Sequence, residues 1–225
     1  MYEWLAFASV WMALWFLFYI ERPLLRREML WVSAFTALAG LTQPLFVPEF
    51  WTPPSLFNLA ATSGFDVESI LFAFATGGIA SVLYESGLKI RHRRMLEGER
   101  RERRWLHLFS LAAVPVVFVL LLVLTSLNPI YCLAAAMLTG AVGAVVCRPD
   151  LIKNTLLGGV LFTGLYFFFF VFVGTMFPTF IEAWNLAALS GVVVAGVPIE
   201  ELMFAFTFGM FWSGVYEHVK HYVVR

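Results

Sequence analysis

Three glutamates stand at the start of two long apolar segments that resemble each other. The segment from Glu68 to Glu85 aligns without a gap with the segment from Glu200 to Glu217, and the copies share Phe-Ala-Phe, a glycine, a serine and a closing Tyr-Glu. Glu201 follows Glu200 directly in the second copy. Because a charge at the end of a membrane-length apolar helix is costly, these carboxyl groups are candidates for a function.

The carboxyl groups are suited to proton transfer. Adjacent acids with no nearby cation favour a protonated carboxyl, which can act as a general acid, whereas an ionised carboxylate can act as a base. Glu68, Glu200 and Glu201 are therefore candidates for proton transfer. Asp66 is a further candidate, although it could equally cap the helix that follows. A structural role is also open for the glutamates, because acids in the first turn complement the helix dipole.

The similarity between the two copies extends toward the N-terminus. Asn58–Gly64 returns as Asn185–Gly191, Arg22-Pro23 returns as Arg148-Pro149, and the second copy carries an insertion at Val192–Gly196. Self-similarity in a fixed order indicates two homologous halves. We therefore expect a first three-helix repeat over residues 1–87, a basic loop and a linking helix over 88–127, and a second three-helix repeat over 128–225.

Both copied segments carry small residues at a spacing of four. Residues four apart share one face of a helix, and small side chains allow two backbones to approach closely. The pattern therefore predicts that each of these helices packs tightly against a neighbour. The residues are Ala73, Gly77 and Ser81 in the first copy and Ala205, Gly209 and Ser213 in the second.

The composition is that of a membrane protein. Hydrophobic residues make up 61% of the chain, charged residues 13%, and the mean hydropathy is +0.83. A helix needs about 20 apolar residues to cross the hydrocarbon layer of a bilayer. We predict an all-α polytopic membrane protein with seven transmembrane helices, arranged as a 3+1+3 parallel internal repeat. The predicted spans are 4–20, 29–47, 67–85, 106–126, 130–147, 154–177 and 199–217, and the short apolar segment 184–197 is expected to be interfacial or re-entrant.

The basic residues predict an orientation. All 15 Lys and Arg residues follow the first, third, fifth or seventh predicted span, and therefore lie on one side of the membrane. By the positive-inside rule that side is cytoplasmic, which places the N-terminus outside and the C-terminus in the cytoplasm. The basic loop 89–104 is expected to contact anionic lipid. The lipid bilayer is thus an expected partner, no nucleic acid is expected, and a homo-oligomer remains open.

The element Pro-x-Glu-Glu-x-x-Phe at residues 198–204 resembles the motif of the membrane-integral lycopene cyclase family of carotenoid biosynthesis. That family occurs as two three-span subunits or as one fused chain, and this chain resembles the fused type. In the first half Asp66 stands at the proline position, and Ser69 stands at the position of the second glutamate. The resemblance implies a lycopene cyclase-like carotenoid end-group cyclase, an intramolecular lyase or isomerase that acts on a hydrophobic linear carotenoid.

The reaction that the resemblance implies involves no net redox change, so no cofactor and no metal are expected. A proton adds to the terminal double bond, a neighbouring double bond attacks the resulting tertiary cation, and a proton is lost. The site needs an acid, a base and an apolar pocket, and aromatic rings can stabilise the cation. The resemblance thus makes Glu68 and Glu200 the candidates for acid and base, in either order, and Glu201 the neighbour that tunes them. Each aromatic candidate could instead belong to the core or the interface, and the asparagines could instead form turns or caps. The candidates for substrate contact are Phe72, Phe204, Trp51, Trp184, Asn58 and Asn185.

Two other functions stay open. Parallel three-span repeats also build transporters of small molecules, in which paired carboxyl groups would couple proton movement. A non-catalytic carotenoid-binding protein is the other alternative, because the first copy of the motif is altered. A retinal photoreceptor is disfavoured, since it needs a Schiff-base lysine inside a helix and the last predicted span has no lysine before Lys220.

Overall fold

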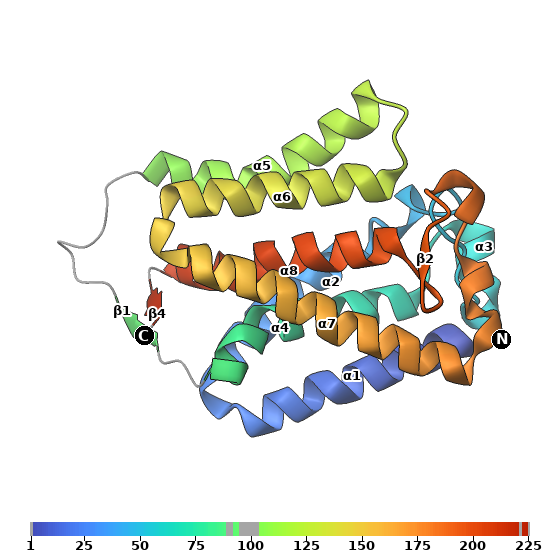
Figure 1. Ribbon diagram of the computed structural model, residues 1–225, viewed down its shortest axis with the longest axis horizontal. Helices are drawn as coiled ribbons and strands as arrows, with labels where there is room; N and C mark the ends of the chain where they lie inside the picture. Colours follow the sequence, from blue (N-terminus) through green and yellow to red (C-terminus); the bar gives the residue numbers. More distant parts are fainter. Residues whose placement is uncertain (1, 89–91, 95–103, 221, 225) are drawn as a thin grey trace.

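A computed structural model describes residues 2–88, 92–94, 104–220 and 222–224. Within these residues the chain forms a bundle of long helices that run along the longest axis of the molecule (Figure 1). The N-terminus and the C-terminus lie at opposite ends of this bundle. The long helices are α1 (Glu3–Glu21), α2 (Arg26–Gly40), α4 (Val67–Leu88), α5 (Arg104–Leu124), α6 (Pro129–Cys147), α7 (Ile152–Met176) and α8 (Ile199–Lys220).

Short elements join the long helices. Strands β1 (His92–Arg94) and β4 (Tyr222–Val224) pair at the end that carries the C-terminus. The short helix α3 (Leu59–Ser63) and the hairpin of β2 (Val193–Val194) and β3 (Val197–Pro198) lie at the opposite end, which we call the hairpin end (Figure 1). Short 3-10 helices cover Pro23–Leu25, Gln43–Leu45, Leu56–Asn58, Pro149–Leu151, Pro178–Ala183 and Leu186–Ala188.

Local sequence explains several helix boundaries. Pro23 follows α1 and Pro149 follows α6, and a proline disfavours the helical conformation of the residue before it. Helix α6 begins with Pro129 at its first position, and the side chain of Asn128 accepts a hydrogen bond from the N–H of Ile130. This combination of an asparagine cap and a first-turn proline is a strong signal for the start of a helix.

The two halves pack their helices in the same pattern. Helix α4 packs on α1 and α2, helix α8 packs on α6 and α7, and α4 and α8 contact each other in the middle of the molecule. Helix α5 packs on α6. The 3+1+3 repeat and its domain boundaries stay a prediction, which this shared packing pattern supports.

Glycines allow the close approach of the central helices. A Cβ atom added to Gly77 of α4 would overlap the side chain of Thr36 on α2. A Cβ atom added to Gly209 of α8 would lie 2.7 Å from the backbone oxygen of Gly158 on α7. Ser213 of α8 donates a hydrogen bond of 3.0 Å to the backbone oxygen of Asn154 on α7. The tight packing predicted from the small residues is confirmed in both halves.

Four helical segments among the described residues are long and apolar enough to cross a membrane, which supports membrane integration. They are Glu3–Glu21, Val67–Gly87, Pro129–Cys147 and Pro149–Met176, and Ala112–Leu124 is a shorter apolar helix. The predicted orientation of the termini stays a prediction, and most of the basic loop 89–104 lies outside the described residues.

One predicted span differs from the structure, and the short apolar segment after α7 forms turns and a hairpin. The span predicted over residues 29–47 is too long, because α2 ends at Gly40 and its 15 residues are followed by a 3-10 turn. A helix of that length spans about 22 Å, less than the hydrocarbon layer of about 30 Å. The segment 184–197 contains a 3-10 turn and the β2–β3 hairpin. Positive φ angles at Ala195 and Gly196 form its two-residue turn, so the insertion in the second copy is this hairpin.

Candidate active site

An apolar cavity with a volume of about 220 Å³ lies between the two halves. Helices of both halves contribute to its wall, together with α5 and the chain that follows α2. An apolar cavity of about 150 Å³ is large enough to hold benzene, so this cavity has room for a substituted six-membered ring. Aromatic residues in the wall include Trp4, Trp51, Phe72, Tyr166, Phe170 and Phe204.

Glu201 is the only acidic residue among the described residues that line the cavity. Its carboxyl group is held at both oxygens. Trp184 Nε1–H donates to Oε1 at 2.9 Å, and the hydroxyl of Tyr166 donates to Oε2 at 2.8 Å. Because a tyrosine hydroxyl can also accept a hydrogen bond, this site can hold the carboxyl group with or without its proton.

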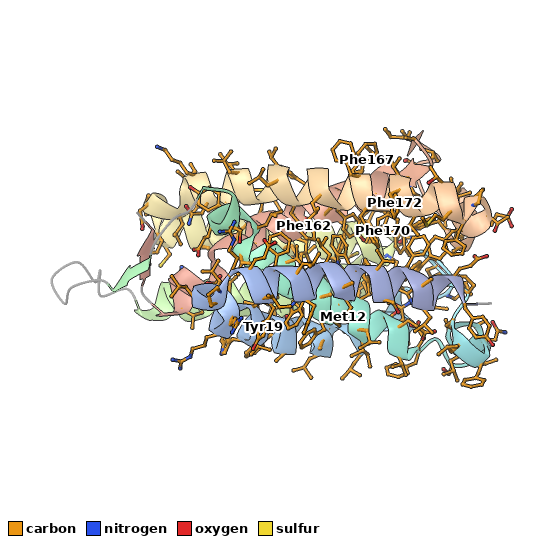
Figure 2. All side chains as sticks on the ribbon, turned by 90° about the horizontal axis from the view of Figure 1, so that it is seen from below. Met12, Tyr19, Phe162, Phe167, Phe170 and Phe172 are labelled. Atoms are coloured by element: carbon orange, nitrogen blue, oxygen red, sulfur yellow. The ribbon has the colours of Figure 1, made fainter. Side chains whose placement is uncertain are left out.

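The sequence of α7 explains why Tyr166 points to the cavity. Phe162, Tyr166 and Phe170 are spaced by four residues and therefore share one face of the helix. All three are buried, and Figure 2 shows Phe162 and Phe170 on the side of α7 that faces α1. Phe168 is 71% exposed on another face. The face that buries the phenylalanines thus brings the tyrosine hydroxyl to Glu201.

Glu68 and Glu200, the duplicated glutamates, are buried but do not line the cavity. The backbone N–H of Leu56 donates to Oε1 of Glu68 at 2.7 Å, and the backbone N–H of Ser190 donates to Oε1 of Glu200 at 2.8 Å. The hydroxyl of Tyr131 also donates to Oε1 of Glu200, at 2.6 Å. Each of these glutamates therefore ties a loop at the hairpin end to the start of its helix.

The second carboxyl oxygen of each duplicated glutamate is buried. Neither Oε2 of Glu68 nor Oε2 of Glu200 has a hydrogen-bond partner among the parts of the chain that the structure describes. Both residues thus make the same kind of contact, with one oxygen on a loop amide and the other unpaired. The structure brings Glu201, and not the duplicated pair, to the apolar cavity.

Asp66 is completely buried next to the start of α4. Its Oδ1 accepts hydrogen bonds from Trp4 Nε1–H at 2.9 Å and from the backbone N–H of Ser69 at 2.6 Å, and its Oδ2 accepts one from the Ser69 hydroxyl at 3.0 Å. Burial raises the pKa of Asp66 above its usual value, and the nearby charge of Glu68 adds to this rise, whereas the hydrogen bonds from Ser69 and Trp4 oppose it. Ser69 itself lines the cavity.

The predicted substrate contacts divide into two groups. Phe72, Phe204 and Trp51 line the cavity. Trp184 does not, but it donates to Glu201 and its ring stacks on that of Trp51, with the ring centres 6.3 Å apart.

The two asparagines lie elsewhere. Asn58 and Asn185 are exposed at the hairpin end and do not line the cavity. Asn58 adopts a left-handed conformation with φ of 58° directly before α3, and the Asn185 side chain donates to the backbone oxygen of Pro48 at 3.4 Å. These positions correspond to the turn-forming role that the sequence also allowed.

Several residues of the site carried no signal in the sequence. Tyr131, Tyr166 and Trp4 are single polar-tipped aromatic residues in apolar helices, and hydrophobic patterns do not show which carboxyl group each one meets. Gln43 also lines the cavity, and its Nε2 is buried with no hydrogen-bond partner among the described groups. An amide N–H in such a place can point to the π-electrons of an unsaturated ligand.

A metal site would need a group of at least three His, Cys, Asp or Glu side chains. The described part of the chain contains no such group.

The helices and the cavity together define a helical membrane protein with an acid-lined apolar site between two bundles. A family model described as Lycopene cyclase matches residues 128–219, which include Tyr131, Tyr166, Glu200 and Glu201. The resemblance to the lycopene cyclase family is therefore confirmed, and it supports a lycopene cyclase-like role in carotenoid biosynthesis. The match covers the second half of the chain, and the fused two-half type stays a prediction. No curated protein and no solved structure matches the chain.

Proposed function

We propose that this protein is a carotenoid end-group cyclase that closes a ring on a linear carotenoid within the membrane. The observation that carries the proposal is the position of Glu201, whose carboxyl group lines an apolar cavity of the size of one substituted ring. The family match supports the cyclase class and a carotenoid substrate. The shared packing pattern of the two halves supports the fused 3+1+3 arrangement.

Glu201 acts as the general acid in this proposal. Its proton moves to a carbon of the terminal double bond, and the positive charge develops on the neighbouring tertiary carbon. A second double bond of the same chain attacks this carbon and closes the ring, and a proton then leaves the ring cation. No electrons are gained or lost, so the product is an isomer of the substrate.

The wall of the cavity supports this chemistry. Apolar side chains exclude the water that would otherwise trap the cation, and aromatic faces such as those of Phe72 and Phe204 attract positive charge. Trp184 and Tyr166 fix the carboxyl group of Glu201 in one orientation. General acid catalysis contributes about 10²- to 10⁴-fold to a rate when the acid is positioned in this way.

Expression in bacteria that accumulate a linear carotenoid tests the proposal. The wild-type protein should convert it to a cyclic product that chromatography detects. Glu201→Gln should lower this conversion at least about 100-fold, because the amide keeps an acceptor for Trp184 but has no proton to give. Glu200→Gln is the matched control and should stay within about tenfold of wild type, since its amide oxygen still accepts from Ser190 and Tyr131.

Two results would contradict the proposal. Full activity of Glu201→Gln would reject Glu201 as the acid. Failure of the correctly inserted wild-type protein to convert any linear carotenoid would favour a binding protein or a transporter, and uptake measurements would then separate these two.

A further inference from the structure

Ser69 and Glu201 occupy the same position in the two copies and line the same cavity. Each directly follows the duplicated glutamate of its helix, Glu68 in α4 and Glu200 in α8. The two residues at this position thus carry a carboxyl group in the second half and a hydroxyl group in the first half. A hydroxyl group is a poor proton acceptor unless a stronger base can take the hydroxyl group's own proton at the same time.

Ser69 is hydrogen-bonded to such a base, the carboxylate of Asp66. Its hydroxyl donates to Oδ2 of Asp66 at 3.0 Å, and Asp66 is completely buried. Trp4 Nε1–H donates to both residues, at 2.9 Å to Oδ1 of Asp66 and at 3.3 Å to Oγ of Ser69. A line of hydrogen bonds thus runs from the cavity through the Ser69 hydroxyl to the Asp66 carboxylate.

Helix capping accounts for only part of this arrangement. A cap needs the Asp66 carboxylate to accept the backbone N–H of Ser69, which Oδ1 does at 2.6 Å. The bond between Oδ2 and the Ser69 hydroxyl is additional, and Ser69 is one of the residues that line the cavity. Burial also raises the pKa of Asp66, which makes its carboxylate a stronger base than an exposed aspartate.

We propose that Ser69 and Asp66 form the base that removes the proton from the ring cation, an assignment that rests on the proposed cyclase function. A C–H bond next to the cationic carbon breaks, and its electron pair becomes the new double bond of the ring. The proton passes to Oγ of Ser69 while the original hydroxyl proton of Ser69 passes to Oδ2 of Asp66. Asp66 then releases a proton to water, and Glu201 takes one up from water for the next turnover.

This assignment also makes the pair a determinant of product specificity. A tertiary ring cation has hydrogens on more than one neighbouring carbon, and the position of the ring double bond depends on which of them is lost. A base fixed on one wall of the cavity selects the hydrogen that faces it. The Ser69–Asp66 pair would therefore set the ring type.

Two variants test the pair in isolated membranes that are supplied with a linear carotenoid in D₂O. Ser69→Ala removes the hydroxyl and leaves Asp66, whereas Asp66→Asn removes the base and keeps a good helix cap. Each should lower the formation of the normal ring about 10- to 100-fold. Each should also raise the share of rings with a displaced double bond, or the deuterium content of the recovered linear carotenoid. Ser69→Thr keeps a hydroxyl and should keep the normal ring type.

The outcomes separate this assignment from the proposed function. Glu201→Gln should give neither rings nor deuterium exchange, because no cation forms. Ser69→Ala and Asp66→Asn with an unchanged ring type and no added exchange, whether or not the total yield falls, would show a purely structural role and overturn the assignment while the cyclase function stands. Absence of any cyclisation by wild-type membranes would overturn both.

Discussion

The first turns of α4 and α8 are similar in sequence, but they differ at the position that lines the cavity. In α8 this position is Glu201, whose carboxyl group meets the cavity directly and is held by Trp184 and Tyr166. In α4 it is Ser69, which lines the cavity and whose hydroxyl donates a hydrogen bond to the carboxyl group of Asp66. Two helices of similar sequence thus supply similar walls, whereas the proposed acid–base chemistry requires two different proton-transfer groups.

The glutamates that the two copies share make their contacts outside the cavity. Glu68 and Glu200 both bind a backbone N–H of a loop at the hairpin end, and both lie outside the cavity lining. The shared glutamates thus support the scaffold and the shared Phe72 and Phe204 line the cavity, whereas the differing residues Ser69 and Glu201 carry the proposed chemistry.

The largest expected effect comes from moving the acid between the halves. Glu201→Ser should lower cyclisation at least about 100-fold, and adding Ser69→Glu should restore no more than about a tenth of the wild-type rate. The reason is that the first half has no counterpart of Tyr166. The offset between Arg22-Pro23 and Arg148-Pro149 places Gly40 at that position, and Gly40 also lines the cavity.

Product formation by membranes of the single and double variants checks this prediction. The amount of each protein in the membrane is the control, because a charged residue at position 69 next to Asp66 can reduce insertion. A double variant as active as wild type would show that the acid can act from either helix. This result would contradict the assignment of the acid to α8 and of the base to α4.

Helix packing gives the next effect, on stability. Gly209→Ala should lower the free energy of unfolding by about 1–3 kcal/mol, because the new methyl group meets the backbone of Gly158 and α7 must move. Gly77→Ala should cost a similar amount, since the new methyl group would overlap the buried and β-branched side chain of Thr36, whose Cβ lies 2.7 Å away. Gly164→Ala on α7 is the control, because nothing lies within 4 Å of a Cβ atom there. Thermal unfolding of the detergent-solubilised variants measures all three, and equal stabilities would refute the tight glycine contacts.

Hydropathy and helix signals predicted where the long helices lie, because these depend on residues close together in the chain. They did not predict which glutamate meets the cavity. Glu200 and Glu201 are rotated by about 100° from each other around α8, so the choice depends on how α8 is turned against α4, α6 and α7. They also missed the early end of α2 at Gly40, since the apolar residues continue to Val47 but form turns.

The smallest of these effects concerns the two tryptophans that hold the carboxyl groups. Trp184→Phe removes one of the two hydrogen bonds to Glu201 and should slow cyclisation about tenfold, the equivalent of one hydrogen bond to a charged or polar group. Trp4→Phe removes one of three hydrogen bonds to Asp66, so it should slow the reaction less than about fivefold.

The two variants should also differ in the ring type of their product. Loss of Trp184 disturbs the acid and should leave the ring type unchanged, whereas loss of Trp4 disturbs the base and should displace the double bond in part of the product. Rates and ring types measured side by side would contradict the division of roles if Trp184→Phe, and not Trp4→Phe, changed the position of the double bond.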